Sequence, residues 1–256
     1  MARFTVLLAM LLEAASAHTI MNQIIAGGKT YPQGEGIYMP SSNVYQDDVN
    51  ANTMACNGAP ATGFASSKTV IPVKAGDTVT GAWLHELTST GPGNGADNKV
   101  LASSHKGPVI AYMKKVADAS ANPASGPGNG WFKVAEAGLI SPNQWAVDKL
   151  IADGGLQQVK IPACLESGDY LMRFEIIALH SAGSAKGAQV ILHVRSTFPS
   201  PASNNFYQFY MECAQFRVTG AAAPQSPATY SIPGIYSATD PGTYHFATRC
   251  PRSFAD

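Results

Sequence analysis

His18 directly follows a predicted signal-peptide cleavage site, so it is expected to become an N-terminal residue with a free α-amino group. Arg3 supplies a positive charge, residues 4–12 form a short apolar run, and residues 15–17 (Ala-Ser-Ala) have the small-x-small pattern that signal peptidase cleaves. The apolar run is about half of the roughly 20 residues that a membrane-spanning helix needs. We therefore expect residues 1–17 to be removed, so that a secreted mature chain begins at His18.

A free N-terminal histidine can chelate a metal ion by itself. Its α-amino group has an ordinary pKa of about 8, so a metal ion can displace the proton near neutral pH. The imidazole of the same residue adds a second nitrogen, and one further imidazole completes a three-nitrogen, T-shaped site. Such a site suits copper, which heads the affinity order of the divalent metals. The alternative is that His18 merely marks the end of the signal.

Several histidines are candidates for the second imidazole, and sequence spacing does not select one because the ligands must meet across the fold. His85 follows Trp83 on an expected strand, and we interpret it as a structural or surface residue. The candidates are His85, His105, His180, His193 and His245.

The chain has four cysteines, and secretion places them in an oxidising compartment where two disulfides form. Three pairings are possible, and their spacing does not choose among them. Zinc binding is the rival interpretation, but the Cys-x-x-Cys pairs typical of zinc sites are missing. The four are Cys56, Cys164, Cys213 and Cys250.

The composition excludes two classes of partner. Charged residues make up 13% of the chain, with 17 basic and 17 acidic residues, so the basic excess of a nucleic-acid-binding protein is missing. After the signal, no segment is apolar enough to span a membrane. The 24 glycines and 17 prolines favour a loop-rich β protein.

Alternating apolar and polar residues predict many short strands without a βαβ rhythm, which indicates an antiparallel, immunoglobulin- or fibronectin-like β-sandwich with long loops and little helix. We expect one domain over residues 18–256, one short helix at residues 145–151, and no carbohydrate-binding module. Long loops are expected at residues 89–98 and 119–130. Strands are expected at residues 68–85 (two strands joined by an Ala-Gly-Asp turn), 107–116, 157–161, 170–180 and 209–218.

Seven segments, taken together and in order, carry a family resemblance. They are HT at 18–19, MACNG at 54–58, VKAGDTV at 73–79, SSHKGP at 103–108, GDYLMRFEIIALH at 168–180, FYMECAQ at 209–215 and PGIYSATDPG at 233–242. With these segments the chain resembles the fungal cellulose-active lytic polysaccharide monooxygenases from His18 nearly to its end.

The resemblance implies a copper-binding histidine brace, formed by the amine and ring of His18 and the ring of His105. Tyr210 would lie on the axial side of the metal as a distant phenol. His180 and Gln208 would lie just outside the ligands and donate hydrogen bonds toward the reacting oxygen, as groups around a metal site commonly do. Tyr236 corresponds to a tyrosine on the family's flat substrate face, with Tyr45 and Tyr244 as looser candidates.

The resemblance also implies a disulfide between Cys56 and Cys213, which leaves Cys164 for Cys250. Arg173 and Glu175 are expected to support the site or the packing of their strand, without a catalytic role.

One segment departs from the family pattern. The family reads Gly-Ala-Gln-Phe-Tyr-Met without interruption, whereas here residues 190–208 separate Gln189 from Phe209. Every valine codon begins with GT and the glutamine codon CAG ends in AG, and these are the letters at the two boundaries of an intron. We therefore interpret this segment as a translated, unspliced intron. The alternative is a genuine loop insertion. Gln189 and Gln208 are both candidates for the hydrogen-bonding glutamine, and Gln208 is preferred because it adjoins Phe209.

The function implied is oxidative cleavage of β-1,4-glucosidic bonds in cellulose, with hemicellulose as a further substrate. The expected partners are one copper ion per chain, an external electron donor, and dioxygen or hydrogen peroxide, and the protein is expected to be a monomer. The alternatives are a non-catalytic copper- or polysaccharide-binding protein with the same brace, a structural cell-wall protein, and a glycoside hydrolase. A hydrolase needs two carboxylates about 5–9.5 Å apart, and no motif here suggests such a pair.

Overall fold

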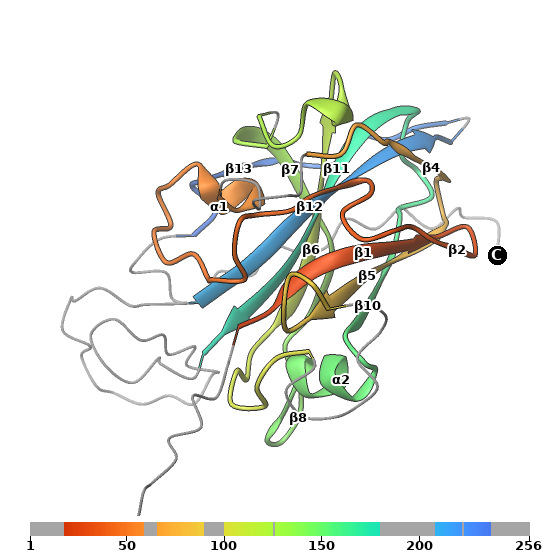
Figure 1. The fold of residues 1–256 in the computed structure, drawn as a ribbon. Helices are drawn as coiled ribbons and strands as arrows, with labels where there is room; N and C mark the ends of the chain where they lie inside the picture. The colour runs from red at the N-terminus through yellow and green to blue at the C-terminus, as the bar shows by residue number, and fades with distance from the viewer. Residues whose placement is uncertain are drawn as a thin grey trace, which may run out of the picture.

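The structure is a computed structural model, and it shows two β-sheets packed against each other (Figure 1). Strands predominate because short alternating segments rich in β-branched and aromatic residues place one row of side chains in the core. The residues described are 18–58, 66–89, 100–124, 126–179, 208–221 and 223–236.

The smaller sheet carries the N-terminal strand. Its order is β10 (Leu156–Lys160), β5 (Thr78–Leu84), β1 (Ile20–Ala26) and β2 (Lys29–Thr30), with every neighbouring pair antiparallel. The register of β1 against β5 shifts between Met21 and Gln23.

The larger sheet carries the longest strands. Its order is β13 (Tyr230–Ile232), β7 (Gly128–Ala137), β6 (Val109–Val116), β11 (Gly168–Ala178), β12 (Gln208–Thr219) and β3 (Ile37–Tyr38). β4 (Ile71–Lys74) also pairs with β12, and among the described strands this pair alone is parallel. The predicted antiparallel β-sandwich is thus confirmed, with one parallel addition at the edge.

Helix is scarce in the described residues, as the sequence predicts. α1 (Thr53–Cys56) lies beside β12, and α2 (Ala146–Ala152) lies near the hairpin of β8 (Leu139–Ser141) and β9 (Gln144–Trp145) (Figure 1). A single turn of 3₁₀ helix, η1, spans Ala119–Ala121. The helix expected at residues 145–151 is α2, and the Asp148 carboxylate accepts a hydrogen bond from the Trp145 backbone N–H at its start.

Each predicted strand is present, but the two strands expected within residues 68–85 belong to different sheets. β4 pairs with β12 and β5 pairs with β1, so the turn between them is a crossover rather than a hairpin. The loop expected at residues 119–130 is shorter than predicted because β7 begins at Gly128. β1 was not among the predicted strands, since a short run after a signal peptide carries little pattern of its own.

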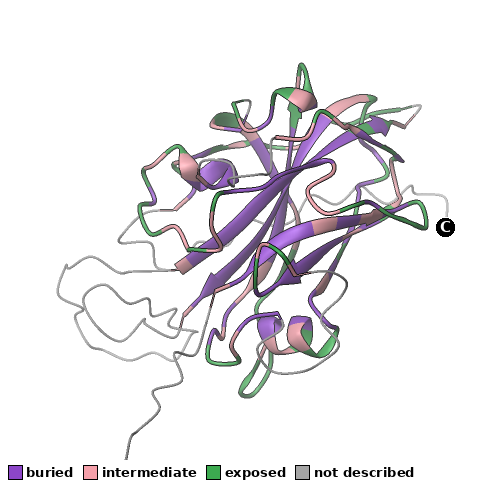
Figure 2. Cartoon of the chain, in the orientation of Figure 1, coloured by how far each residue is buried: buried purple, intermediate pink, exposed green. Residues whose placement is uncertain are grey.

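The larger sheet is buried on both faces, which its long apolar strands require. One core cluster fills the space between the sheets and includes Trp83, Phe174 and Tyr210. A second cluster covers the outer face of the larger sheet and includes Tyr112 and Trp131. The central strands β6, β11 and β12 are accordingly drawn mostly as buried (Figure 2), whereas β7 is buried only in its middle.

α1 is attached to the outer face of the larger sheet by the predicted disulfide. Cys56 at the end of α1 is bonded to Cys213 in β12, with 5.2 Å between their Cα atoms. Cys164 is also disulfide-bonded. Cys250 lies outside the described residues, so its pairing with Cys164 stays a prediction.

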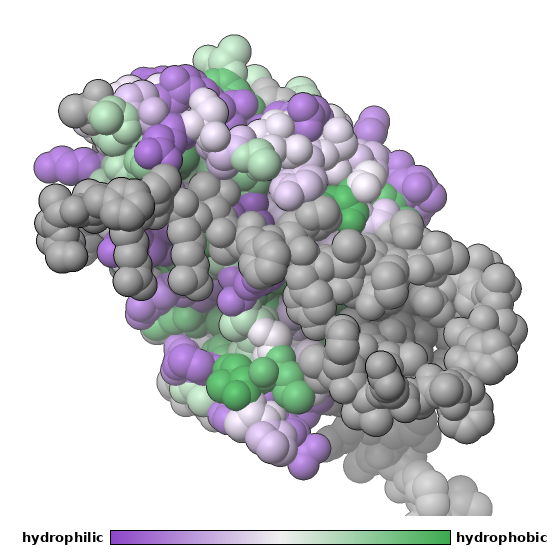
Figure 3. Space-filling model, turned by 180° about the vertical axis from the view of Figure 1, so that it is seen from behind, coloured by the Kyte–Doolittle hydropathy of each residue, from purple (hydrophilic) through white to green (hydrophobic). Residues whose placement is uncertain are grey.

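The surface offers few apolar groups among the described residues. Figure 3 shows a mostly hydrophilic or neutral face with small hydrophobic groups. The exposed large apolar side chains are Val44, Leu139 and Ile140. No helix in the described part of the chain is both long and apolar enough to cross a membrane.

Candidate metal centre

Two histidines from distant parts of the sequence converge on one tyrosine. The ring centroid of Tyr210 in β12 lies 6.4 Å from that of His18 and 6.0 Å from that of His105. The His18 ring meets Tyr210 edge-on, at an interplanar angle of 80°. The fold thus brings together His18, His105 and Tyr210, the residues that the family resemblance selected. Of the other four candidates for the second imidazole, only His85 lies in the described part of the chain.

The loop that carries His105 is held in place from two directions. Lys106 forms an ion pair with Asp148 of α2, and its backbone carbonyl accepts a hydrogen bond from Leu179 N at 2.8 Å. Gly107 permits this close approach, since a Cβ there would lie 1.8 Å from the Ile177 carbonyl oxygen. The segment Ser-His-Lys-Gly-Pro therefore fixes His105 against both α2 and the end of β11.

The other histidine is held by the start of β1. Ile20 pairs with Leu84 of β5, and the Thr19 hydroxyl donates to the Leu84 carbonyl oxygen at 3.2 Å. Burial, followed by charge repulsion from His85, lowers the pKa of His18. Both effects favour the neutral imidazole, which is the form that binds metal.

Tyr210 is 1% exposed and stays protonated at ordinary pH. Burial, and then the neighbouring Tyr45, raise the pKa of its phenol above the usual value. The hydroxyl donates to Gln208 Oε1 at 3.1 Å. Gln208, predicted as a hydrogen-bonding residue of the site, therefore contacts the tyrosine directly.

Tyr45 is a closer neighbour of the candidate centre than the sequence indicated. Its ring is stacked on that of His18, with a centroid distance of 6.1 Å and an interplanar angle of 7°, and it meets Tyr210 edge-on. Tyr45 was only a loose candidate for substrate contact. Nothing in its surrounding sequence signals contact with a histidine 27 positions earlier.

Four further candidate residues lie outside the described part of the chain. His180 follows Leu179, the last described residue after β11, and His193 falls in the undescribed segment as well. Gln208 pairs with Ala178 at the adjoining end of β12. The role predicted for His180 accordingly stays a prediction, as does that of the looser candidate Tyr244, and the histidine candidate His245 is also outside the described residues.

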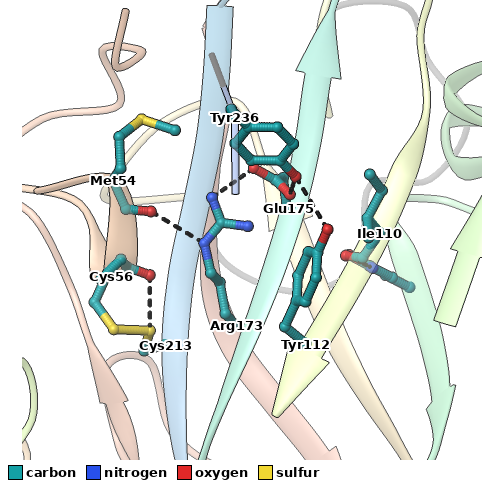
Figure 4. Close-up of polar contacts among 10 residues, drawn as sticks. Met54, Cys56, Ile110, Tyr112, Arg173, Glu175, Cys213 and Tyr236 are labelled. Atoms are coloured by element: carbon teal, nitrogen blue, oxygen red, sulfur yellow. Dashed lines mark hydrogen bonds and ion pairs between the residues drawn. A yellow bond between two sulfur atoms is a disulfide. The ribbon is translucent and has the colours of Figure 1, made fainter. Parts of the chain in front are cut away.

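Tyr236 lies on the outer face of the larger sheet, with its hydroxyl directed inward (Figure 4). The hydroxyl donates to Glu175 Oε2 at 2.6 Å, and Tyr112 Oη lies 3.3 Å away. Burial, followed by the charge on Glu175, raises the pKa of Tyr236 well above its usual value. Only the partly exposed ring is available for a substrate.

Glu175 is itself paired with Arg173, as Figure 4 also shows. The Arg173 Nη2 to Glu175 Oε1 distance is 2.5 Å, and both side chains are fully buried. Arg173 Nε also donates to the Met54 carbonyl oxygen in α1 at 3.1 Å. This network joins α1, β11 and the loop after β13, in keeping with the packing role expected for the pair.

The donor set fits copper better than the other common metals. In the described residues no cluster of three His, Cys, Asp or Glu side chains could hold a metal ion. A brace needs only two imidazoles, because the third nitrogen is the amine that cleavage before His18 would create. An all-nitrogen set of this kind suits copper, whereas calcium and magnesium prefer oxygen ligands.

Comparison with known proteins agrees with this geometry. A family model for Auxiliary Activity family 9 (formerly GH61) matches residues 18–194 and 199–252. The chain belongs to Auxiliary Activity family 9. This is a family of copper-dependent lytic polysaccharide monooxygenases, so membership implies oxidative polysaccharide cleavage.

Curated relatives carry the same family description. The chain is 44% identical over 234 residues to family 9 lytic polysaccharide monooxygenase D of Malbranchea cinnamomea, which covers 91% of this chain and 86% of that protein. It is 46% identical over 231 residues to monooxygenase A of Neurospora crassa, which covers 90% of this chain but only 63% of that longer protein.

Solved structures share the fold. CvAA9A has a TM-score of 0.66 at 25% identity, and the match covers 91% of this chain and 95% of that one. A cellulose-active polysaccharide monooxygenase from M. thermophila has a TM-score of 0.61 at 27% identity, covering 88% and 89%. The β-sandwich of the family 9 enzymes is therefore the fold of this chain.

Proposed function

We propose that this protein is a secreted, copper-dependent monooxygenase that oxidatively cleaves β-1,4-glucosidic bonds in cellulose. The observation that carries the proposal is the convergence of His18 and His105 on Tyr210. Family membership and a cellulose-active structural relative support the substrate class. Hemicellulose is a further candidate substrate of the same site.

The proposed copper ligands are the amine and ring of His18 and the ring of His105. When bound, copper supplies the one-electron chemistry with dioxygen or hydrogen peroxide, and an external reductant provides the electrons. The protein holds both imidazoles in place before the metal arrives, through the strand pairing of β1 and through the ion pair of Lys106 with α2. A site held in this way binds metal without first reorganising.

The neighbouring residues are proposed to control protons and orientation. The Tyr210 phenol keeps its proton, because burial raises its pKa, and it donates a hydrogen bond to Gln208. That hydrogen bond occupies the amide oxygen of Gln208 and leaves its N–H groups for the reacting oxygen. His180 is proposed to donate beside Gln208, and Tyr236 is proposed to contact the sugar through its ring, since its hydroxyl is bound to Glu175.

Secretion, a monomeric state and processing before His18 belong to the same proposal. Secretion and processing rest on the pattern of residues 1–17 and on the need for a free amine. The active species is therefore the mature chain with one copper ion.

The test incubates mature, copper-loaded protein with swollen cellulose and ascorbate, and analyses the soluble products by mass spectrometry. Oligosaccharides with lactone, aldonic acid or ketone mass shifts, formed only with reductant, are expected. Unoxidised oligosaccharides formed without reductant would identify a hydrolase. Tight copper or cellulose binding without any product would identify a non-catalytic binding protein.

A further inference from the structure

His85 makes a direct hydrogen bond to the backbone of His18. Its Nδ1 lies 2.6 Å from the His18 carbonyl oxygen. A carbonyl oxygen only accepts, so Nδ1 of His85 carries a proton. Nε2 is buried and has no hydrogen-bond partner among the described residues, which leaves the contact with His18 as the polar interaction of this ring.

This contact acts on a residue that becomes the N-terminus after cleavage and therefore has a chain neighbour on one side only. Once the chain begins at His18, a single peptide bond, to Thr19, joins this residue to the rest of the chain, and β1 begins at the next residue. The amine and the ring of His18 both branch from its Cα, which can rotate only about the Cα–C bond relative to that peptide. The orientation of the planar peptide therefore limits where the amine and the ring can lie. A hydrogen bond to its carbonyl oxygen fixes the plane, and with it the geometry of a chelate formed by amine and ring.

His85 is well placed to act as a fixed donor. It directly follows β5 and is 7% exposed. Its own carbonyl oxygen accepts a hydrogen bond from Asn43 Nδ2 at 2.6 Å. The preceding residue, Leu84, pairs with Ile20, so His85 and His18 are held at the same end of two paired strands.

We propose that His85 is a positioning residue that sets the orientation of His18 for metal binding through its Nδ1–H. The inference rests on the copper-binding role proposed for His18 and deepens it. His85 does not bind the metal itself. Groups of this kind, which orient a ligand without touching the metal, typically change metal affinity by about 10- to 100-fold when removed.

Three substitutions of His85 in the mature protein distinguish the contribution of Nδ1 from that of Nε2. His85→Phe removes both, His85→Asn places an N–H where Nδ1 lies, and His85→Gln places its amide nearer to Nε2. Copper(II) affinity is expected to fall roughly 10- to 100-fold in the Phe and Gln variants, and to recover most of that loss in the Asn variant. The electron paramagnetic resonance spectrum of bound copper(II) is expected to change and recover in the same order.

A matched control separates positioning from general loss of stability. Gln157 accepts a buried hydrogen bond from Trp83 Nε1 at 2.8 Å, two residues before His85. Gln157→Met is expected to lower the melting temperature of the copper-free protein without changing copper affinity or the spectrum. Unchanged copper affinity and spectrum in a folded His85→Phe variant would overturn the proposal.

Imidazole nitrogen NMR of the copper-free parent tests the contact independently of copper. A proton on Nδ1 of His85, protected from exchange, is expected, and a ring protonated at Nε2 alone would overturn the inference. A parent protein that binds no copper but shows the Nδ1-protonated form would refute the proposed function while leaving the contact intact.

Discussion

The two faces of the larger sheet at the start of β12 use polar groups in opposite ways. On the inner face, the ring of Tyr210 lies close to the rings of His18 and His105. On the outer face, the adjacent Phe209 packs at 5.1 Å against Tyr236, whose hydroxyl leads to Glu175 and its partner Arg173. Consecutive residues of one strand thus face two different environments.

The difference lies in how charge is balanced. The outer network contains opposite charges that neutralise each other, which is how buried ionised groups are tolerated. The inner face brings together the imidazoles of His18 and His105, and burial lowers the pKa of His18, which favours its uncharged form. A closed ionic network stabilises one packing arrangement, whereas a group of neutral imidazoles is suited to receive a cation.

The largest expected effect follows from removing a proposed ligand on the inner face. His105→Ala should lower copper(II) affinity by more than the roughly 100-fold at the upper end for residues outside the ligand set. Oxidised products should disappear, while circular dichroism of the copper-free protein stays that of the parent. Calorimetric titration with copper measures the loss, and the exposed Lys149→Ala serves as the unaffected control. Parent-like affinity in His105→Ala would break the comparison between the faces.

The outer face should respond in stability alone. Glu175→Ala leaves Arg173 buried without its partner, so the free energy of unfolding should fall by about 3–5 kcal/mol. Replacing both, with Arg173→Met and Glu175→Leu, should recover much of this, because it removes both charges. Urea denaturation measures the change. A copper affinity that falls as far as in His105→Ala would show that the two faces are not separable.

Glu212, a buried residue of β12 whose carboxylate accepts a hydrogen bond from Met21 N of β1, predicts how the stability of the protein depends on pH. Burial raises the pKa of Glu212 from 4.5 to about 8, although Met21 N, Asn57 and the nearby Arg173 favour its ionised form. Between these values the folded protein holds a proton that the unfolded chain has released, so stability falls as pH rises, by at most about 1.4 kcal/mol per pH unit. Glu212→Gln should flatten this decline and be more stable than the parent at pH 8. Parallel stability profiles from pH 4.5 to 8 would contradict it.

The smallest effect is expected from deleting residues 190–208. β11 ends at Ala178 and β12 begins at Gln208, so the deletion would bring Gln189 into the position of Gln208 and keep the strand register. Loop-closure entropy predicts a gain of only about 1 kcal/mol from the shorter connection. Thermal denaturation and the cellulose assay compare the two forms. Loss of oxidised products from the deleted form would establish the segment as a functional insertion, and sequencing the transcript tests the intron hypothesis directly.

The sequence predicted the strands whose pattern is intrinsic and missed those that depend on their neighbours. β11 and β12 are long apolar runs, so they were recognised almost to their ends. The assignment of β4 and β5 to different sheets could not be predicted, because both the turn and the alternation are also compatible with a hairpin.

The candidate site could likewise be predicted only in part from the sequence. Residue chemistry singled out His18, and the family resemblance selected His105, but neither indicated the stacking of Tyr45 or the contact from His85. These contacts arise where the loop before α1 and the end of β5 meet the N-terminus, and no local pattern records such a meeting. The inward hydroxyl of Tyr236 was missed for a related reason, since its partner Glu175 lies 61 positions earlier in the chain.

The most direct test of the central claim compares two proteins that differ by one residue: the mature chain beginning at His18, and the same chain with one alanine before it. Copper(II) titration followed by paramagnetic resonance is predicted to show one tightly bound ion with nitrogen coupling in the first protein. Strongly weakened binding and a different spectrum are predicted in the second, because its amine no longer belongs to His18. Equal affinity and identical spectra would contradict a centre built on the N-terminal histidine.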